Sequence, residues 1–155
     1  METERLRIRA LRAEDAEALY AVLSDAAVMR FIEAPFTLRQ TADFIARVNA
    51  ASPPFARAVI WKESGALIGH LIYHPYGSES WELGWILHRE FWGRGIAGEL
   101  TAAVIEDAKR KKIPELVIEC DPAQNVTRHL AEKHGFRCAG EEGRLAVYRR
   151  RMENA

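Results

Sequence analysis

Residues 92–99 read Trp92-Gly93-Arg94-Gly95-Ile96-Ala97-Gly98-Glu99, and this stretch decides how the rest of the chain is interpreted. It places three glycines within six residues, between a strand-like segment and a segment with helical periodicity. Glycine lets a backbone approach a ligand closely, and the first N–H groups of a helix have no partner within the helix. The stretch therefore predicts an anion site, with a diphosphate as the expected ligand. A flexible turn before a helix would need only one or two glycines.

Two other phosphate-binding loops fit this stretch less well. A P-loop needs Lys and then Ser or Thr after its last glycine, whereas Glu99-Leu100 follow here. The dinucleotide-binding fingerprint matches literally at Gly93-x-Gly95-x-x-Gly98, and Glu119 or Asp121 lies about 20 residues further on, where that fold places its ribose-binding acid. In that fold, however, the strand turns directly into the first glycine, whereas residues 88–92 intervene here. A single β-α-β crossover is visible, so this interpretation is weak.

Hydrophobic periodicity on both sides of the glycines predicts one α/β domain of the mixed α+β kind over residues 1–155. We expect strands at 5–11, 55–62, 67–74, 80–87, 116–120, 136–139 and 145–150. We expect helices at 14–24, 38–49, 95–111 and 124–134, with a short helical or irregular segment at 25–33. Thr37 and Gln40 fit a capping box at the start of the second helix. Turn residues between the middle strands indicate hairpins, so the sheet is expected to be mixed, mostly antiparallel and flanked by helices.

Composition excludes several classes of protein. The chain carries 22 basic and 22 acidic side chains, and this balance argues against a nucleic-acid partner, which usually selects a basic excess. The basic residues at 109–112 fit a solvated helix end that suits the macrodipole. Cys120 and Cys138 are the only cysteines, and the histidines show no metal spacing, so no metal site is expected. Without a signal segment or a membrane-spanning run, we expect a cytoplasmic protein with no membrane partner.

Four stretches together carry a resemblance to a known family. They are Leu6-Arg7-Ile8-Arg9-Ala10-Leu11 followed by Glu14-Asp15-Ala16, Glu82-Leu83-Gly84-Trp85-Ile86-Leu87, Phe91-Trp92-Gly93-Arg94-Gly95-Ile96-Ala97 followed by Glu99, and Glu132-Lys133-His134-Gly135-Phe136. In this order they resemble the opening strand and helix, the central strand, the pyrophosphate loop and the end of the second cofactor-side helix of the GNAT superfamily of N-acetyltransferases. More narrowly, the chain resembles the branch that contains ribosomal-protein N-terminal acetyltransferases. The resemblance covers about residues 5–152.

The resemblance implies an enzyme with a central β-α-β unit that binds acetyl-CoA. Such an enzyme moves the acetyl group to a primary amine, of a small molecule or a protein N-terminus, by direct attack in a ternary complex. The partners implied are acetyl-CoA and an amine acceptor, and a homo-oligomer is compatible with the family. A non-catalytic acyl-CoA-binding or regulatory module on the same fold is the alternative. It is motivated by two departures from the family pattern, at Gln124 and Ala131.

The same resemblance assigns the cofactor contacts. Backbone amides of the loop would cradle the pyrophosphate, at Gly93, Arg94, Gly95, Ile96, Ala97 and Gly98. The end of the central strand, Leu87 and His88, would pair with the pantetheine arm, and the N–H of Leu87 would face the thioester oxygen. The family usually has Asn where Gln124 stands, so either Gln124 or the next residue, Asn125, would contact the cofactor. Arg128, with Arg94 and Arg89, would offset phosphate charge.

Acid–base chemistry has one leading candidate. Glu82 lies on the central strand between Trp81 and Trp85, where burial would favour the proton uptake that a general base needs. An ordinary strand carboxylate, or one paired with Arg, is the alternative for Glu82. The weaker candidates for the base are His88, His74 and Glu33. The tyrosine that protonates the leaving thiolate in many relatives would fall at Ala131, so that acid is absent.

Overall fold

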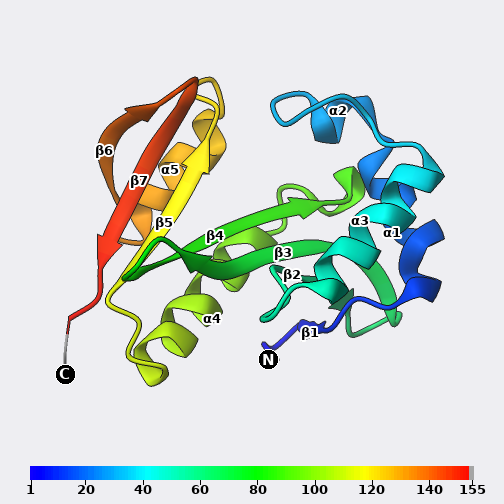
Figure 1. The fold of residues 1–155 in the computed structure, drawn as a ribbon, viewed down its shortest axis with the longest axis horizontal. Coiled ribbons are helices and arrows are strands. Elements are labelled where there is room, and N and C mark those ends of the chain that lie inside the picture. The colour runs from blue at the N-terminus through cyan, green and yellow to red at the C-terminus, as the bar shows by residue number, and fades with distance from the viewer. Residues whose placement is uncertain (154–155) are drawn as a thin grey trace.

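The computed structural model describes residues 1–153 and is built around a seven-stranded sheet (Figure 1). The strands are β1 (Leu6–Arg9), β2 (Ala56–Trp61), β3 (Ala66–Tyr76), β4 (Ser80–Leu87), β5 (Glu115–Cys120), β6 (Arg137–Glu142) and β7 (Leu145–Arg151). The helices are α1 (Ala16–Leu23), α2 (Ala26–Met29), α3 (Leu38–Ala50), α4 (Ile96–Arg110) and α5 (Asn125–Lys133), with 3-10 turns η1 (Ala13–Asp15) and η2 (Arg89–Phe91). Every strand and long helix predicted from periodicity is present.

The strand order is β1-β2-β3-β4-β5-β7-β6, and all neighbours are antiparallel except β4 and β5. The parallel pair is joined by α4, which is the one predicted β-α-β crossover. The mixed, mostly antiparallel sheet is therefore confirmed. The dinucleotide-binding interpretation is wrong, because that fold needs an open, mostly parallel sheet built from repeated β-α-β units.

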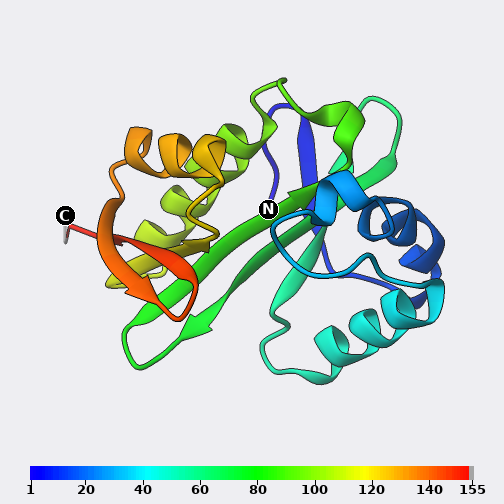
Figure 2. The same ribbon diagram turned by 90° about the horizontal axis from the view of Figure 1, so that it is seen from above.

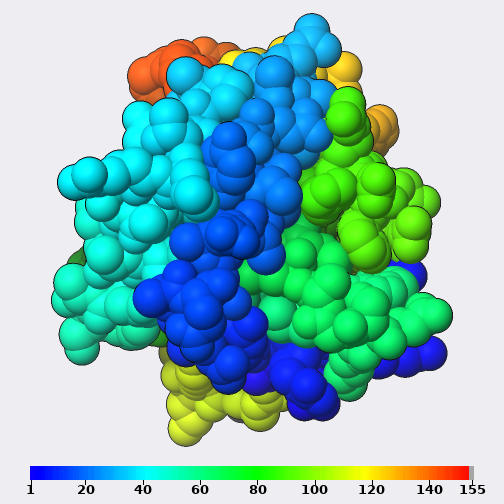
Figure 3. Space-filling view, turned by 90° about the vertical axis from the view of Figure 1, so that its right-hand side faces the viewer, coloured from blue at the N-terminus to red at the C-terminus, as the bar shows by residue number. Residues whose placement is uncertain are grey.

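Helices cover both faces of the sheet, and each face has its own apolar core. Figure 2 shows α4 and α5 on one side of the sheet and α1, α2 and α3 on the other. The first core joins α4 and α5 to strand residues such as Leu83 and Ile118, and the second joins α1 and α3 to residues of β2. Figure 3 shows the face that lies on the right in Figure 1, and the N-terminal third of the chain, from blue to cyan, covers much of this face. Among residues 1–153 no helix is long and apolar enough to cross a membrane.

Local chemistry sets several element boundaries. The predicted capping box is confirmed: the Thr37 N–H donates to Gln40 Oε1 at 2.8 Å, and the Gln40 N–H donates to Thr37 Oγ1 at 3.1 Å. The last hairpin differs from the prediction of a strand at 136–139. Phe136 packs in the core before β6 begins, and Gly140, with φ of 111°, lies at a bulge within β6. The bulge lets β6 continue to residue 142, so the turn lies at Gly143 and Arg144.

Candidate acetyl-transfer site

The opening that positions the site lies between β4 and β5. Their parallel pairing joins only residues 80–82 to residues 115–117, so the C-terminal half of β4 has no strand partner on this side. Figure 1 shows β5 and β7 leaning away from β4 beyond this point. The sheet is therefore split, and the split exposes backbone groups that a continuous sheet would bond.

Two residues of β4 direct their backbone polar groups toward this gap. His88 donates its N–H to the carbonyl of Ile68, on β3, at 2.7 Å. Successive strand residues direct their N–H and C=O groups to opposite sides. The register between β3 and β4 is uninterrupted up to Leu87, so the alternation can be counted back from His88. The N–H and C=O groups of Trp85 and Leu87 therefore point away from β3 and toward the gap. The Leu87 carbonyl accepts a hydrogen bond of 3.0 Å from the indole Nε1 of Trp92.

The expectation that His88 pairs with the pantetheine arm is not supported. Besides the bond from its N–H to Ile68, its carbonyl accepts the N–H of Phe91 at 2.9 Å. Its ring Nδ1 accepts the N–H of Glu90 at 3.1 Å. His88 thus caps η2 and closes the edge of β3, and Leu87 is the last β4 residue whose N–H points into the gap.

The glycine loop follows η2 directly. Gly93 and Gly95 have φ of 73° and 76°, in the left-handed region that glycine adopts without strain. The first backbone bond of α4 runs from the Glu99 N–H to the Gly95 carbonyl at 3.1 Å. Within the described part of the chain, the N–H groups of residues 93–98 have no hydrogen-bond acceptor. The loop therefore has the open amides and the helix N-terminus that an anion site requires.

Side chains around the loop hold it in place. Arg94 is exposed, and its guanidinium lies 4.7 Å from the ring centroid of Phe91. A Cβ on Gly98 would lie 3.6 Å from Leu130 Cδ1 and 3.7 Å from His134 Nε2, so this glycine lets α4 approach α5 closely. Ile96 is buried in the core beneath the loop, and Ala97 packs partly buried against it.

Glu99 fixes the loop to the start of the chain, a role that sequence reasoning missed. Its carboxylate accepts hydrogen bonds from the Thr3 hydroxyl, from Arg5 Nε at 2.7 Å and from the Arg5 N–H at 3.1 Å. Burial raises the pKa of Glu99, but the hydrogen bonds from Thr3 and Arg5 lower it more, so the net pKa lies below the ordinary value. No local pattern signals this contact, because 94 residues separate Arg5 from Glu99.

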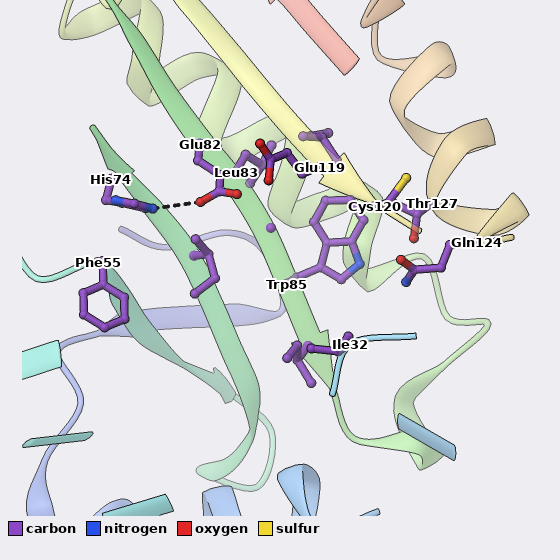
Figure 4. Close-up of a pocket in the computed structure, with 14 residues that line it drawn as sticks. Ile32, Phe55, His74, Glu82, Leu83, Trp85, Glu119, Cys120, Gln124 and Thr127 are labelled. Atoms are coloured by element: carbon purple, nitrogen blue, oxygen red, sulfur yellow. Dashed lines mark hydrogen bonds and ion pairs between the residues drawn. The ribbon is translucent and has the colours of Figure 1, made fainter. Parts of the chain in front are cut away.

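A cavity of about 280 Å³ opens against the gap (Figure 4). It is lined by residues from β3, β4, β5, α5 and neighbouring loops: Ile32, Phe55, Ile72, His74, Glu82, Leu83, Gly84, Trp85, Ile86, Ile118, Glu119, Cys120, Gln124 and Thr127. In Figure 4 Trp85 extends from β4 toward Cys120 and Thr127. The wall is mostly apolar, so its two carboxylates dominate the local charge.

Glu82 and His74 form a pair in this wall. The His74 Nε2 lies 2.8 Å from Glu82 Oε1, and the two side chains are 28% and 23% exposed. The sequence singled out Glu82 and gave His74 less weight, whereas the structure brings the two together because they are cross-strand neighbours on β3 and β4. Glu33 and His88, the other candidates, do not line the cavity.

The second carboxylate, Glu119, belongs to a cluster that sequence reasoning did not find. The Tyr76 hydroxyl donates to Glu119, and a carboxylate oxygen of Glu142 lies 3.2 Å from the same hydroxyl oxygen. The hydrogen bond to Glu119 raises the pKa of Tyr76 above its usual range, so the phenol stays protonated. The three residues lie on β3, β5 and β6, and only the folded sheet brings them together. Within residues 1–153, no His, Cys, Asp and Glu side chains are grouped to hold a metal ion.

The predicted contacts on α5 separate into two kinds. Gln124 lines the cavity, and its Oε1 accepts the N–H of Asp121 at 2.9 Å, whereas Asn125 is exposed and does not line it. Arg128 donates from Nε to the Tyr148 hydroxyl and from Nη1 to the Pro122 carbonyl, both at 2.9 Å. Two of its donors therefore anchor α5 to β7 and to the loop after β5, and are not left for a phosphate.

Comparison with known proteins decides the family. A family model described as an acetyltransferase (GNAT) domain matches residues 5–137. The chain belongs to the GNAT family of acetyltransferases. The resemblance found in the sequence is thus confirmed, and so is the expectation of an acetyl-CoA-dependent N-acetyltransferase.

This GNAT protein has relatives along its whole length. It is 29% identical over 141 residues to YnaD of Bacillus subtilis, named as an uncharacterized N-acetyltransferase, and the match covers 89% of this chain and 82% of YnaD. A GNAT-family acetyltransferase from Bacillus anthracis matches with a TM-score of 0.86 at 26% identity, covering 98% of each chain. RimL, a ribosomal protein acetyltransferase solved in complex with coenzyme A, matches with a TM-score of 0.82 at 20% identity, covering 99% of this chain and 97% of RimL. At that identity the likeness to RimL concerns the fold.

Proposed function

We propose that this GNAT protein transfers the acetyl group of acetyl-CoA to a primary amine by direct attack in a ternary complex. The observation that carries the proposal is the position of the cavity. It adjoins the gap between β4 and β5, it holds the Glu82 carboxylate, and the strand that borders it leads through η2 into the glycine loop. A cofactor anchored at the loop and laid along β4 would bring its thioester to the cavity.

The cofactor contacts are assigned to backbone groups. The free N–H groups of residues 93–98 would bind the pyrophosphate, and the arm would lie along β4 as an added strand beside Trp85 and Leu87. The N–H of Leu87 would then donate a hydrogen bond to the thioester oxygen, where negative charge develops during attack. Gln124, at the cavity wall, is better placed than Asn125 to contact the arm.

The proposed chemistry needs two proton transfers. An acceptor that arrives as an ammonium ion gives its first proton to the carboxylate of Glu82, which His74 holds in place. The neutral nitrogen then forms a bond to the thioester carbon, the carbon–sulfur bond breaks, and the sulfur takes the second amine proton. Ala131 is buried in the core and offers no acid for that step. A thiol pKa near 8.5 lets the sulfur leave without one.

The charge of the cavity supports a cationic acceptor. Its wall includes the carboxylates of Glu82 and Glu119 and no Lys or Arg side chain. An ammonium group would be attracted to such a wall, and an anionic acceptor would be repelled. The acceptor amine therefore belongs either to a small molecule or to a protein N-terminus that reaches the cavity.

The cofactor site is tested by a pair of glycine variants with the same backbone geometry. Gly95 and Gly77 both have φ of 76°, but Gly77 lies in the β3–β4 turn, where a Cβ would meet nothing within 4 Å. We expect Gly95→Asp to weaken acetyl-CoA binding at least about 100-fold, because it places a carboxylate against the diphosphate. Gly77→Asp controls for backbone strain and should bind normally. Equal affinities, measured by calorimetry, would remove the loop from the cofactor site.

Turnover separates an enzyme from a binding module. Release of free CoA thiol is measured over a panel of monoamines, diamines, amino acids and short peptides with free N-termini. Turnover with any of them supports the transferase. Tight acetyl-CoA binding with no thiol release on the whole panel favours the non-catalytic module, for which the missing acid at position 131 is the structural argument.

A further inference from the structure

A second charged cleft lies far from the glycine loop. Its volume is about 460 Å³, and it is lined by Lys109, Gly135, Arg137, Arg149, Arg150, Arg151 and Glu153. These residues come from the C-terminal ends of α4, α5 and β7 and from the start of β6, which Figures 1 and 2 place at one edge of the molecule. The glycine loop is at the opposite end of α4. Fifteen residues of helix separate the two sites by roughly 22 Å at 1.5 Å per residue.

Most of the cations in this cleft form no ion pair in the described chain, although the carboxylate of Glu153 also lines it. Arg149 pairs with Glu115 at 2.7 Å, and Lys109 pairs with the exposed Glu106 at 3.3 Å. Taking residues 1–153 alone, the guanidinium groups of the remaining three, Arg137, Arg150 and Arg151, have no carboxylate within 4.0 Å. A chain with no net charge has therefore concentrated unpaired cations at one place.

The hydrogen bonding of Arg150 is especially poor. Its Nη1 donates to the thioether sulfur of Met152 at 3.3 Å, and sulfur is a weak acceptor. The side chain passes close to Gly135, where an added Cβ would lie only 3.0 Å from Arg150 Nε. A half-buried guanidinium whose only side-chain hydrogen bond in the described chain goes to a weak acceptor has donors left for a ligand.

The strand register brings two of the arginines side by side, although Glu115 and Glu142 offset part of the charge of Arg149. Arg137 on β6 lies directly opposite Arg149 on β7, and like charges in that position destabilise a sheet. Charges on an edge strand discourage pairing with another sheet, and this accounts for Arg137 on the edge strand β6. It does not account for Arg150 and Arg151, because β7 lies between β5 and β6. The dipole of each helix, α4 and α5, favours one cation near its C-terminal end. The cleft carries more positive charge than these two cations.

We propose that this cleft, called the arginine cleft, binds an anion of the phosphate class. Guanidinium groups match phosphate oxygens with paired N–H donors, and a tetrahedral dianion can accept bonds from several directions at once. Arg137, Arg150 and Arg151 supply the unpaired donors, and Lys109 adds charge at the cleft wall. The arginine cleft is independent of acetyl transfer, and its ligand is distinct from the cofactor's own pyrophosphate.

The test uses inorganic phosphate and pyrophosphate as probes in titration calorimetry at low salt. Because the glycine loop also attracts phosphate, the protein is first saturated with CoA, and the titration is repeated in the Gly95→Asp background. We expect one saturable site under both conditions, for either probe. Tighter binding of pyrophosphate than of phosphate would indicate a ligand with more than one phosphate group.

Matched arginine variants locate the site. Arg150→Gln and Arg137→Gln should each weaken binding about tenfold or more, since each removes charged hydrogen bonds to the anion. Arg39→Gln, an exposed arginine on α3 without an ion pair in the described chain, should leave binding unchanged. The thermal midpoint of each variant shows that it is folded. The proposal is overturned if neither probe binds the CoA-saturated protein, or if Arg39→Gln weakens binding as much as the cleft variants.

Discussion

Glu82 and His74 share a hydrogen bond in the wall of an apolar cavity, and this pair carries the first prediction. We expect Glu82→Gln to lower kcat/KM about 100-fold at neutral pH, because the acceptor then loses its base. The loss should shrink as the pH rises past about 10.4, the ordinary pKa of an aliphatic amine, because the acceptor is then mostly neutral in solution. His74→Gln, which removes only the positioning partner, should cost less. The measurement is thiol release across a range of pH.

The matched control for this pair is Glu79→Gln, an exposed carboxylate in the turn before β4. It should leave the pH profile of kcat/KM unchanged. A Glu82→Gln loss that stays constant from neutral to high pH would contradict the role of Glu82 as base, and would leave it with a binding role only.

Sequence predicted individual site residues where local chemistry decides them. Glu82 is a candidate because it is an acid in an apolar strand, and Gly93 and Gly95 are candidates because glycine suits such a loop. Sequence does not predict that His74 pairs with Glu82 or that Tyr76 pairs with Glu119, because these contacts join residues of different strands in the folded sheet. The expectation for His88, which the backbone bonds to Ile68 and Phe91 do not support, has the same origin. Which residues of β4 face the gap depends on the register with β3, and sequence does not state that register.

The contact between α4 and the N-terminal segment carries a prediction about pH and stability. Glu99 in the first turn of α4 is 19% exposed and accepts hydrogen bonds from Thr3 and Arg5. Its pKa is depressed in the folded protein, because these bonds outweigh the effect of burial. The contribution of Glu99 to stability is therefore complete above the unfolded pKa of about 4.3, and it is lost as the pH falls through the lower folded pKa.

We expect Glu99→Gln to lower the free energy of unfolding at pH 7 by about 1–2 kcal/mol, as for a charged hydrogen-bond acceptor that is partly exposed. The difference between the wild type and the variant should narrow below about pH 4. Urea unfolding at pH 7 and pH 3 measures it, with Glu106→Gln as the control, since the pair of Glu106 with Lys109 is exposed. A difference of the same size at both pH values would show that Glu99 acts through packing.

Elements were predicted well where a periodic pattern and a cap coincide. The start of α3 was placed correctly from Thr37 and Gln40, whose reciprocal bonds are a local property. The predicted strand at 136–139 ends too early, because Gly140 lies at a bulge within β6 and the turn comes at Gly143. A glycine in a strand bulge and a glycine in a turn look alike in sequence, and only the pairing of β6 with β7 separates them.

The sheet consists of two parts that are joined only by a short parallel pairing between β4 and β5. Only three residue pairs link β4 to β5, and beyond them the two strands leave the gap that the cofactor is proposed to fill. Sequence predicted the mixed sheet and its one crossover, but not that β4 and β5 pair over only three residues, because no local pattern records where two parallel strands separate. The arginine cleft could not be predicted from the net charge of zero, for a similar reason. A sum over the chain does not record that β6 and β7 bring arginines together.

Hydrogen exchange tests whether the gap binds the cofactor, and β4 contains its own control. The N–H of Ile86 bonds to β3 and should exchange slowly with or without ligand, whereas the N–H groups of Trp85 and Leu87 face the gap. We expect acetyl-CoA to slow exchange at Trp85 and Leu87 at least about tenfold, because the pantetheine arm would pair with them as an added strand. Exchange at Ile86 should change little. If saturating acetyl-CoA protects the amides of the glycine loop but neither Trp85 nor Leu87, the cofactor is held at its pyrophosphate alone, and the thioester does not reach the cavity along β4.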